Sequence, residues 1–213
     1  GSIYTHDVSG TDNTAQYNTA YGIGALGAIT DGDQSVAIGY GAGDATTTGR
    51  VLAIGKDAAG ANTTGGAIIA IGDTAYDAAD TENYNIAIGT DALGGPVAGG
   101  EYNVAVGHFS LDALTSGDFN TAVGYAAGSA ITTASGSTLV GRYAGSAITT
   151  GTGVTAIGYG AVDQSTTESH NTGVGYEALG AVINGGEYNV AIGNYALDAL
   201  TSGDNNTAIG HAA

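Results

Sequence analysis

Cysteine, methionine and tryptophan are absent from this 213-residue sequence, and proline occurs once. The absence of cysteine excludes disulfide bonds and thiolate metal sites. Cationic residues are also scarce: 3 Lys and Arg face 20 Asp and Glu, which leaves a formal net charge of -17. Nucleic-acid binding depends on clustered cations that contact phosphates, so this composition argues against a nucleic-acid partner.

Long hydrophobic runs are missing as well. No segment approaches the roughly 18 to 20 apolar residues that span a bilayer, and no signal peptide opens the chain. We therefore expect no membrane insertion by this chain. Disorder is not expected either, because only 11% of the residues are charged and 43% are hydrophobic. The opening Gly1-Ser2 is typical of an expression scar and the last residues stop inside a repeat, so we expect a piece of a longer polypeptide.

Glycine, in contrast, is abundant, and it marks a repeat. A word of the form Asn/Ser-Val/Thr-Ala-Ile/Val-Gly recurs every 16 to 18 residues. The segment from Glu101 returns from Glu187, 86 residues later, which indicates two related five-coil blocks. We divide the chain into an entry segment with the scar, residues 1–17, and a single repeat array, residues 18–213. The repeat glycines are Gly22, Gly39, Gly55, Gly72, Gly89, Gly107, Gly124, Gly141, Gly158, Gly175, Gly193 and Gly210.

The repeat predicts strands. The word alternates with period two, whereas glycine every few residues costs a helix about 1 kcal/mol each relative to alanine. β-Branched residues stand one and three places before the repeat glycine and share one strand face. Alanine stands two places before it and three places after it in nearly every copy. We expect two short strands and two turns per coil, in an all-β parallel β-solenoid (a β-roll) of about 12 coils of 17 residues.

The packing of such a coil bears on whether several chains associate into an oligomer. Two alanine columns suit the narrow interior of a flattened tube, so the valine and isoleucine column would point outward. A soluble protein does not leave so long an apolar stripe in water, and a closed symmetric oligomer would bury it. The inverse arrangement, with valine and isoleucine inside, would permit a monomer, and the period alone does not decide between them. The candidate residues for an oligomer core are Val36, Ile38, Ile54, Ile71, Ile88, Val106, Val123, Val140, Ile157, Val174, Ile192 and Ile209.

The repeat words carry a resemblance. SVAIGYGA, NIAIGTDA, NVAIGNYA and NTAIGHAA resemble the head repeats of trimeric autotransporter adhesins of the Yersinia adhesin type. That resemblance implies a left-handed parallel β-roll, a homotrimer, and an extracellular location at a cell surface or on a virion fibre. Coils in that family are usually shorter, and in its 17-residue length this repeat is more similar to repeats of trimeric phage tail fibres and fibre-like surface proteins. The resemblance begins at about Asn18 and says nothing specific about a ligand.

Patterns that would carry chemistry are missing. The G-x-G-x-x-G match at Gly22–Gly27 belongs to the repeat and lacks the context of a dinucleotide site. Acidic turns such as Asp31-Gly-Asp33 do not follow a calcium-loop pattern, and the carboxylates near Asp73 have no visible catalytic partner. We therefore expect no enzymatic activity, no cofactor and no metal site. The four histidines, which fall on unrelated coils without metal-ligand spacing, are His6, His108, His170 and His211.

Variable positions lie just after the repeat glycine. Exposed aromatic side chains on a rigid scaffold are where recognition would occur, and we name His108, Phe109, Tyr143 and Tyr195 as candidate recognition residues. Covering a seam between chains is an equally good explanation for any single one of them. The net charge favours a neutral glycan, or a site bridged by calcium, over an anionic partner.

Three functions are compatible with this sequence. The leading one is a non-enzymatic structural and adhesive segment of a trimeric surface fibre, which would bind itself as a homotrimer and a surface glycan or protein of a target cell. A phage tail-fibre shaft or receptor-binding segment is one alternative. Threonine pairs that recur in many coils, such as Thr47-Thr48 and Thr132-Thr133, leave an ice-binding β-solenoid as another.

Overall fold

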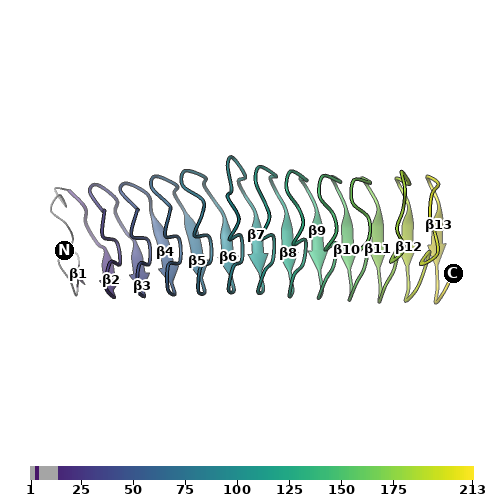
Figure 1. Ribbon diagram of the computed structural model, residues 1–213, viewed down its shortest axis with the longest axis horizontal. Helices are drawn as coiled ribbons and strands as arrows, with labels where there is room; N and C mark the ends of the chain where they lie inside the picture. Colours follow the sequence, from purple (N-terminus) through teal and green to yellow (C-terminus); the bar gives the residue numbers. More distant parts are fainter. Residues whose placement is uncertain (1–2, 5–13) are drawn as a thin grey trace.

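The computed structural model describes residues 3–4 and 14–213. These residues form one parallel sheet whose strands follow each other in chain order, so that the chain winds into a straight rod (Figure 1). From β2 to β13 the chain makes about 11 turns of about 17 residues, one fewer than expected because twelve repeat glycines bound eleven intervals. The strands are β1 Ile3–Tyr4, β2 Thr19–Tyr21, β3 Val36–Ile38, β4 Val51–Ile54, β5 Ile68–Ile71, β6 Ile86–Ile88, β7 Val104–Val106, β8 Thr121–Val123, β9 Thr138–Val140, β10 Thr155–Ile157, β11 Thr172–Val174, β12 Val190–Ile192 and β13 Thr207–Ile209.

Each coil contributes one strand, and the prediction of two strands per coil is wrong. The residues after each repeat glycine form a succession of turns instead. The second and fourth residues after the glycine take a left-handed backbone conformation, as Thr74 (φ 53°) and Tyr76 (φ 56°) illustrate. A positive φ interrupts an extended chain, so the alanine three places after the glycine lies in a turn. The wall opposite the sheet is therefore built from turns, and no helix occurs among the described residues.

The N-terminal segment joins the same sheet. Strand β1 pairs in parallel with β2, which brings Ile3 opposite Thr19, so part of residues 1–17 already belongs to the rod. Gly1 and Ser2, which the sequence analysis interpreted as an expression scar, lie outside the described residues, as does His6.

Alanine fills the narrow interior of the coils. Ala37, two places before a repeat glycine, is 0% exposed, whereas the next residue, Ile38, is 40% exposed. The alanines three places after the glycine are buried too, except Ala213 at the end of the chain, and leucine and isoleucine from the turns, such as Leu111 and Ile131, fill the remaining space. Of the two arrangements that the period left open, the structure has the one with alanine inside and the valine and isoleucine column outside.

Buried asparagines connect successive coils at the start of the strands. The Oδ1 atom of Asn103 accepts a hydrogen bond from the backbone amide of Asn120 (2.9 Å), and its Nδ2 atom donates to the carbonyl of Gly117 (2.9 Å). Asn120 repeats this pattern with the amide of Ser137 (3.0 Å) and the carbonyl of Ala134 (2.8 Å). Buried polar groups need such partners, so this asparagine ladder holds the coils in register.

Two coils are longer than their neighbours, and a buried glutamate precedes each of them. The segments from Gly89 to Gly107 and from Gly175 to Gly193 span 18 residues, one more than the usual coil. Glu82 and Glu168, 86 residues apart, lie seven residues before the first glycine of each long coil, and each is only 5% exposed. In an ordinary coil two successive amides donate to one backbone carbonyl of the next coil, as those of Thr132 and Thr133 do to the carbonyl of Thr149.

The glutamate side chain replaces those backbone bonds. The Oε2 atom of Glu168 accepts from the amides of Thr166 (2.9 Å) and Thr167 (3.0 Å), and its Oε1 atom accepts from the amide of Gly185 in the long coil (3.1 Å). Glu82 makes the corresponding three bonds in the first block. Burial opposes the charged form of Glu168, but these backbone amides outweigh that cost and lower the pKa of its carboxyl.

Candidate recognition surface

A column of valine and isoleucine follows the outer face of the sheet from β3 to β13. Eleven of the twelve predicted oligomer-core residues form the column one place before the repeat glycine, and Val36 lies two places earlier on the same face. Ile38, Val123, Val140, Ile157, Ile192 and Ile209 are exposed, whereas Ile54, Ile71, Ile88, Val106 and Val174 are half-buried. From β3 to β7 the face is wider, because the column three places before the glycine is also apolar. That second column comprises Val36, Leu52, Ile69, Ile86 and Val104.

A row of aromatic rings follows the ends of the strands. We call it the ring ladder; consecutive ring centroids lie 5.0 to 6.3 Å apart. Arg142 lies over it, with its guanidinium carbon 4.5 Å from the ring centroid of Tyr143. The Glu177 carboxylate raises the pKa of the neighbouring Tyr176 hydroxyl, a member of the ladder. The ladder comprises Phe109, Tyr125, Tyr143, Tyr159, Tyr176, Tyr195 and His211.

The ladder contains three of the four predicted recognition residues. Phe109, Tyr143 and Tyr195 are members, and their rings meet neighbours from the coils before or after. His108 is exposed beside them, but its ring is not part of the ladder. From the sequence we predicted these side chains as separate exposed residues, whereas in the structure the turns bring them into one continuous surface.

A second set of rings, which the sequence analysis missed, precedes the strands. Tyr84 stacks on Tyr102 with ring centroids 4.8 Å apart and an interplanar angle of 11°, and Tyr102 stacks on Phe119 at 5.2 Å and 11°. His170 and Tyr188 form a similar pair farther along. All five residues stand five places before a repeat glycine, and this spacing is the signal that could have revealed them. We call Tyr84, Tyr102 and Phe119 the strand-start stack.

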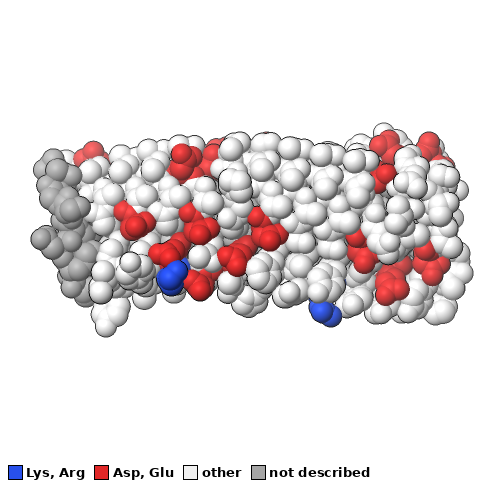
Figure 2. Space-filling model, viewed as in Figure 1, with Lys and Arg blue, Asp and Glu red and all other residues white. Residues whose placement is uncertain are grey.

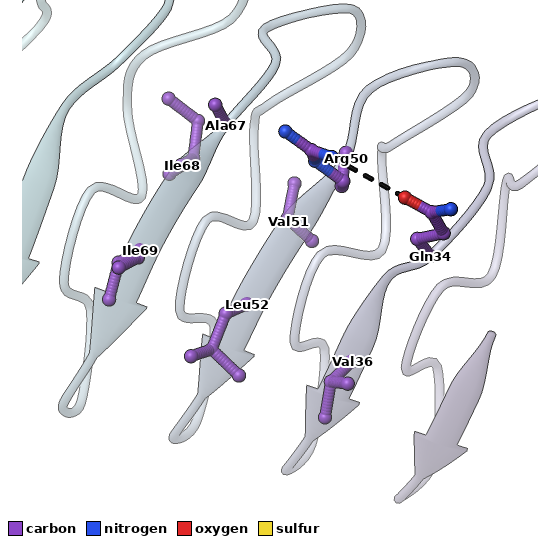
Figure 3. Close-up of a pocket in the computed structure, with 8 residues that line it drawn as sticks. All are labelled: Gln34, Val36, Arg50, Val51, Leu52, Ala67, Ile68 and Ile69. Atoms are coloured by element: carbon purple, nitrogen blue, oxygen red, sulfur yellow. Dashed lines mark hydrogen bonds between the residues drawn. The ribbon is translucent and has the colours of Figure 1, made fainter. Parts of the chain in front are cut away.

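The strand-start position carries no aromatic ring in three consecutive coils. Gln34, Arg50 and Ala67 occupy it there, and the sheet face is hollowed beside them (Figure 3). The hollow has a volume of about 370 Å³, and Arg50 Nη1 donates to Gln34 Oε1 across its rim (3.4 Å). Its lining residues are Gln34, Val36, Arg50, Val51, Leu52, Ala67, Ile68 and Ile69.

A second hollow adjoins the first and shares Arg50 and Ala67 with it. Its volume is about 330 Å³, and it ends at Tyr84, the first ring of the strand-start stack. The polar groups of its wall come from threonine and asparagine, so one hollow is mainly apolar and the other mainly polar. The residues that line the second hollow are Thr48, Gly49, Arg50, Thr64, Gly66, Ala67, Asn83 and Tyr84.

Carboxylates dominate the charged surface, as Figure 2 shows for one face. In the part of the chain that the structure describes, the only ion pairs are those of Lys56 with Asp57 (2.5 Å) and Asp73 (4.0 Å). Arg50 therefore forms no ion pair with a described carboxylate. Burial raises the pKa of the Asp112 and Asp163 carboxyls, and a carboxylate nearby adds to the effect in each case.

The predicted acidic turns have a structural role. Asp118 Oδ1 accepts from the backbone amide of Glu101 (2.8 Å), and Asp204 Oδ1 accepts from that of Glu187 (2.9 Å), each one coil away. Within residues 3–4 and 14–213, no group of three or more histidine, aspartate or glutamate side chains could hold a metal ion. The same residues include no helix able to cross a membrane.

The threonine pairs also connect coils. Thr115, Thr132 and Thr149 each donate a side-chain hydrogen bond to the carbonyl of the corresponding residue in the next coil, at 2.8, 3.2 and 3.0 Å. The first hydroxyl of the pairs that begin at Thr132 and Thr149 is thus engaged within the rod. The second threonine, such as Thr133 or Thr150, is exposed in the turn.

Comparison with protein-family models, with curated proteins and with solved structures gave no match. The architecture of this chain is accordingly an all-β parallel solenoid built from a repeated coil, and its function must be argued from its surface.

Proposed function

We propose that this chain is a non-enzymatic segment of an extracellular, trimeric surface fibre, with the left-handed β-roll architecture of adhesin heads, that attaches to a cell or host surface. The observation that carries the proposal is the outward valine and isoleucine column. It extends over β3 to β13, which at about 4.8 Å per coil corresponds to about 50 Å. Exposed apolar surface of this extent in a soluble protein marks an interface.

A closed trimer is a simple way to cover that column. Three parallel rods can place their sheet faces toward one axis, and closed symmetry avoids open-ended aggregation. The turns and their carboxylates then remain in water. Three chains would carry a formal charge of -51, three times -17, which keeps such an assembly soluble.

The mass in solution tests this association. We expect light scattering after gel filtration to give about 62 kDa, three times 20.6 kDa. Ile157→Glu should shift the mass to that of a single chain, because it places a carboxylate on the shared axis, while circular dichroism stays unchanged. Thr150→Glu, on an exposed turn of the same coil, is the matched control and should stay trimeric. A parent mass of 20.6 kDa would reject the trimer.

Attachment is assigned to the ring ladder. A panel of immobilised neutral glycans and extracellular proteins provides the probe. We expect the combined change of Phe109, Tyr143 and Tyr195 to alanine to weaken binding by about tenfold or more, as the loss of aromatic anchors does at interfaces. Ala126 already occupies the equivalent backbone position with φ 53°, so alanine is compatible with the fold there.

Tyr40→Ala is the control for this test, because Tyr40 is an exposed ring outside the ladder. The control should bind like the parent. Equal binding by the ladder variant, or the failure of the parent to bind any member of the panel, would contradict the assignment.

A further inference from the structure

We propose that the gap in the strand-start row is a binding site for a carboxylated pyranose, which Tyr84 and Arg50 hold from opposite sides above Ala67. The inference rests on the proposed attachment function, for which it names a ligand class. The sugar would occupy the second hollow, whose lining includes none of the proposed oligomer-core residues, so the site does not depend on whether the chain is trimeric.

Tyr84 offers an open aromatic face. One face of its ring is covered by Tyr102 in the next coil, with which it is nearly parallel. The residue in the same position of the preceding coil is Ala67, whose methyl group is too short to cover the other face, and both residues line the second hollow. The π face of an aromatic ring carries negative potential and attracts the C–H groups on the apolar face of a sugar ring.

Arg50 supplies the charge recognition. Its side chain is exposed at the meeting point of the two hollows, and the described residues provide no ion-pair partner for it. Gln34 contacts the guanidinium group through Oε1, as Figure 3 shows. A guanidinium group binds a carboxylate through two parallel hydrogen bonds, which favours a planar carboxylate over a neutral hydroxyl group.

The spacing fits a single sugar unit. Arg50 and Tyr84 stand in the same position of coils two apart, and two strand spacings amount to about 10 Å. A pyranose stacked on Tyr84 can therefore lie over Ala67 and direct a carboxylate toward Arg50. Thr48 and Thr64 line the same hollow and can bond the sugar hydroxyls.

The overall charge does not prevent this local recognition. At physiological ionic strength charges are screened over about 8 Å, so carboxylates farther away act weakly at the groove. The carboxylate beside the groove is that of Glu101, which accepts a hydrogen bond from Nδ2 of Asn83 in the wall of the second hollow (2.9 Å). The net charge of the chain led us to expect a neutral glycan. At this site Arg50 instead favours an acidic sugar.

Saturation-transfer NMR of the whole chain with three sugars tests the ligand class. Methyl glucuronide and methyl N-acetylneuraminide carry the carboxylate in two settings, and methyl glucoside is the neutral control. We expect one or both acidic sugars to bind about tenfold or more tightly than the glucoside, as expected for a hydrogen bond to a charged group. Binding of the glucuronide would identify a uronate as the ligand, and binding of the neuraminide would identify a sialate. Equal binding of all three, or no binding of either acidic sugar, would overturn the proposal.

Two variants then locate the site. Arg50→Gln should abolish the preference for the acidic sugar, whereas Lys56→Gln, which removes a cation that pairs with Asp57 and Asp73 outside both proposed surfaces, should leave it intact. Ala67→Tyr should close the gap and block binding; Tyr84 and Tyr102 take the same positive φ as Ala67, so a tyrosine fits that backbone. Retained binding by Arg50→Gln or Ala67→Tyr would place the site elsewhere. Sugar binding by a monomer would reject only the trimer, whereas a trimer that binds none of these sugars would reject only the groove.

Discussion

Replacement of Gly124 by alanine is expected to disrupt the rod at β8. Gly124 has a φ of 137°, a conformation that L-residues rarely adopt, and a Cβ atom built on it would lie 2.5 Å from the carbonyl oxygen and 2.7 Å from the carbonyl carbon of Gly141. The obstacle is the backbone of the next coil, which cannot withdraw without breaking the stacking. We expect a loss of about 4 kcal/mol or more in the free energy of unfolding, at the upper end for single substitutions.

Denaturant unfolding followed by circular dichroism measures this loss. Gly136→Ala is the matched control, because Gly136 also has a positive φ (68°) but no heavy atom lies within 4 Å of the place that an added methyl group would take. Tyr102 and Phe119 occupy the equivalent place in other coils with φ 58°. The control should cost about 1 kcal/mol or less. An unfolding midpoint of Gly124→Ala equal to that of the parent would show that the coils do not stack this closely.

The second large effect is expected for Glu168→Gln. The amide side chain keeps one acceptor oxygen and turns an NH₂ group toward backbone amides that the carboxylate now bonds, at Thr166, Thr167 and Gly185. Donors left without an acceptor cost about 1 to 3 kcal/mol each when they are buried, and these three bonds are partly buried, so we expect a loss of about 2 kcal/mol near neutral pH. Glu187→Gln, at a partly exposed position in the following coil, should change the stability little.

The stabilisation by Glu168 should depend on pH in a direction that follows from its lowered pKa. Because the pKa of Glu168 is lowered in the folded chain, its stabilisation is fully present above the ordinary carboxyl value. It is lost as the pH falls from that value through the lowered pKa. The difference in unfolding free energy between the parent and Glu168→Gln should therefore shrink over that interval. A difference that stays constant down to the acid limit would contradict the role of the ionised carboxylate.

The periodic features could be predicted from the sequence, because they repeat. Alternation around each glycine correctly placed strands, and the size of alanine correctly placed Ala37 and its equivalents inside. The turns opposite the sheet could not be predicted, because alanine three places after the glycine suits a strand as well as a turn. Only the left-handed conformations of residues such as Thr74 and Tyr76 decide between them.

The individual features of the surface were harder to predict, because they depend on which coils become neighbours. The candidate residues Phe109, Tyr143 and Tyr195 were identified, but not their union with Tyr125 and Tyr159 in one ladder. Arg50 was not identified, because a single cation in a sequence does not indicate a binding site. Its role in the proposed groove depends on the small side chain of Ala67 in the next coil. Glu82 and Glu168 had a readable signal, since each precedes a longer coil by the same interval.

The parallel sheet of β1 to β13 also shapes how the rod unfolds. Each strand contacts only the strand before it and the strand after it. The free energy of such an array is close to a sum of coil terms and nearest-neighbour couplings, as in a one-dimensional chain of interacting units. A weakened coupling at β8 would therefore divide the protein into two independently melting blocks. The same linearity lets coils be gained or lost in groups, so that the rod changes its length while the local structure of every remaining coil is preserved.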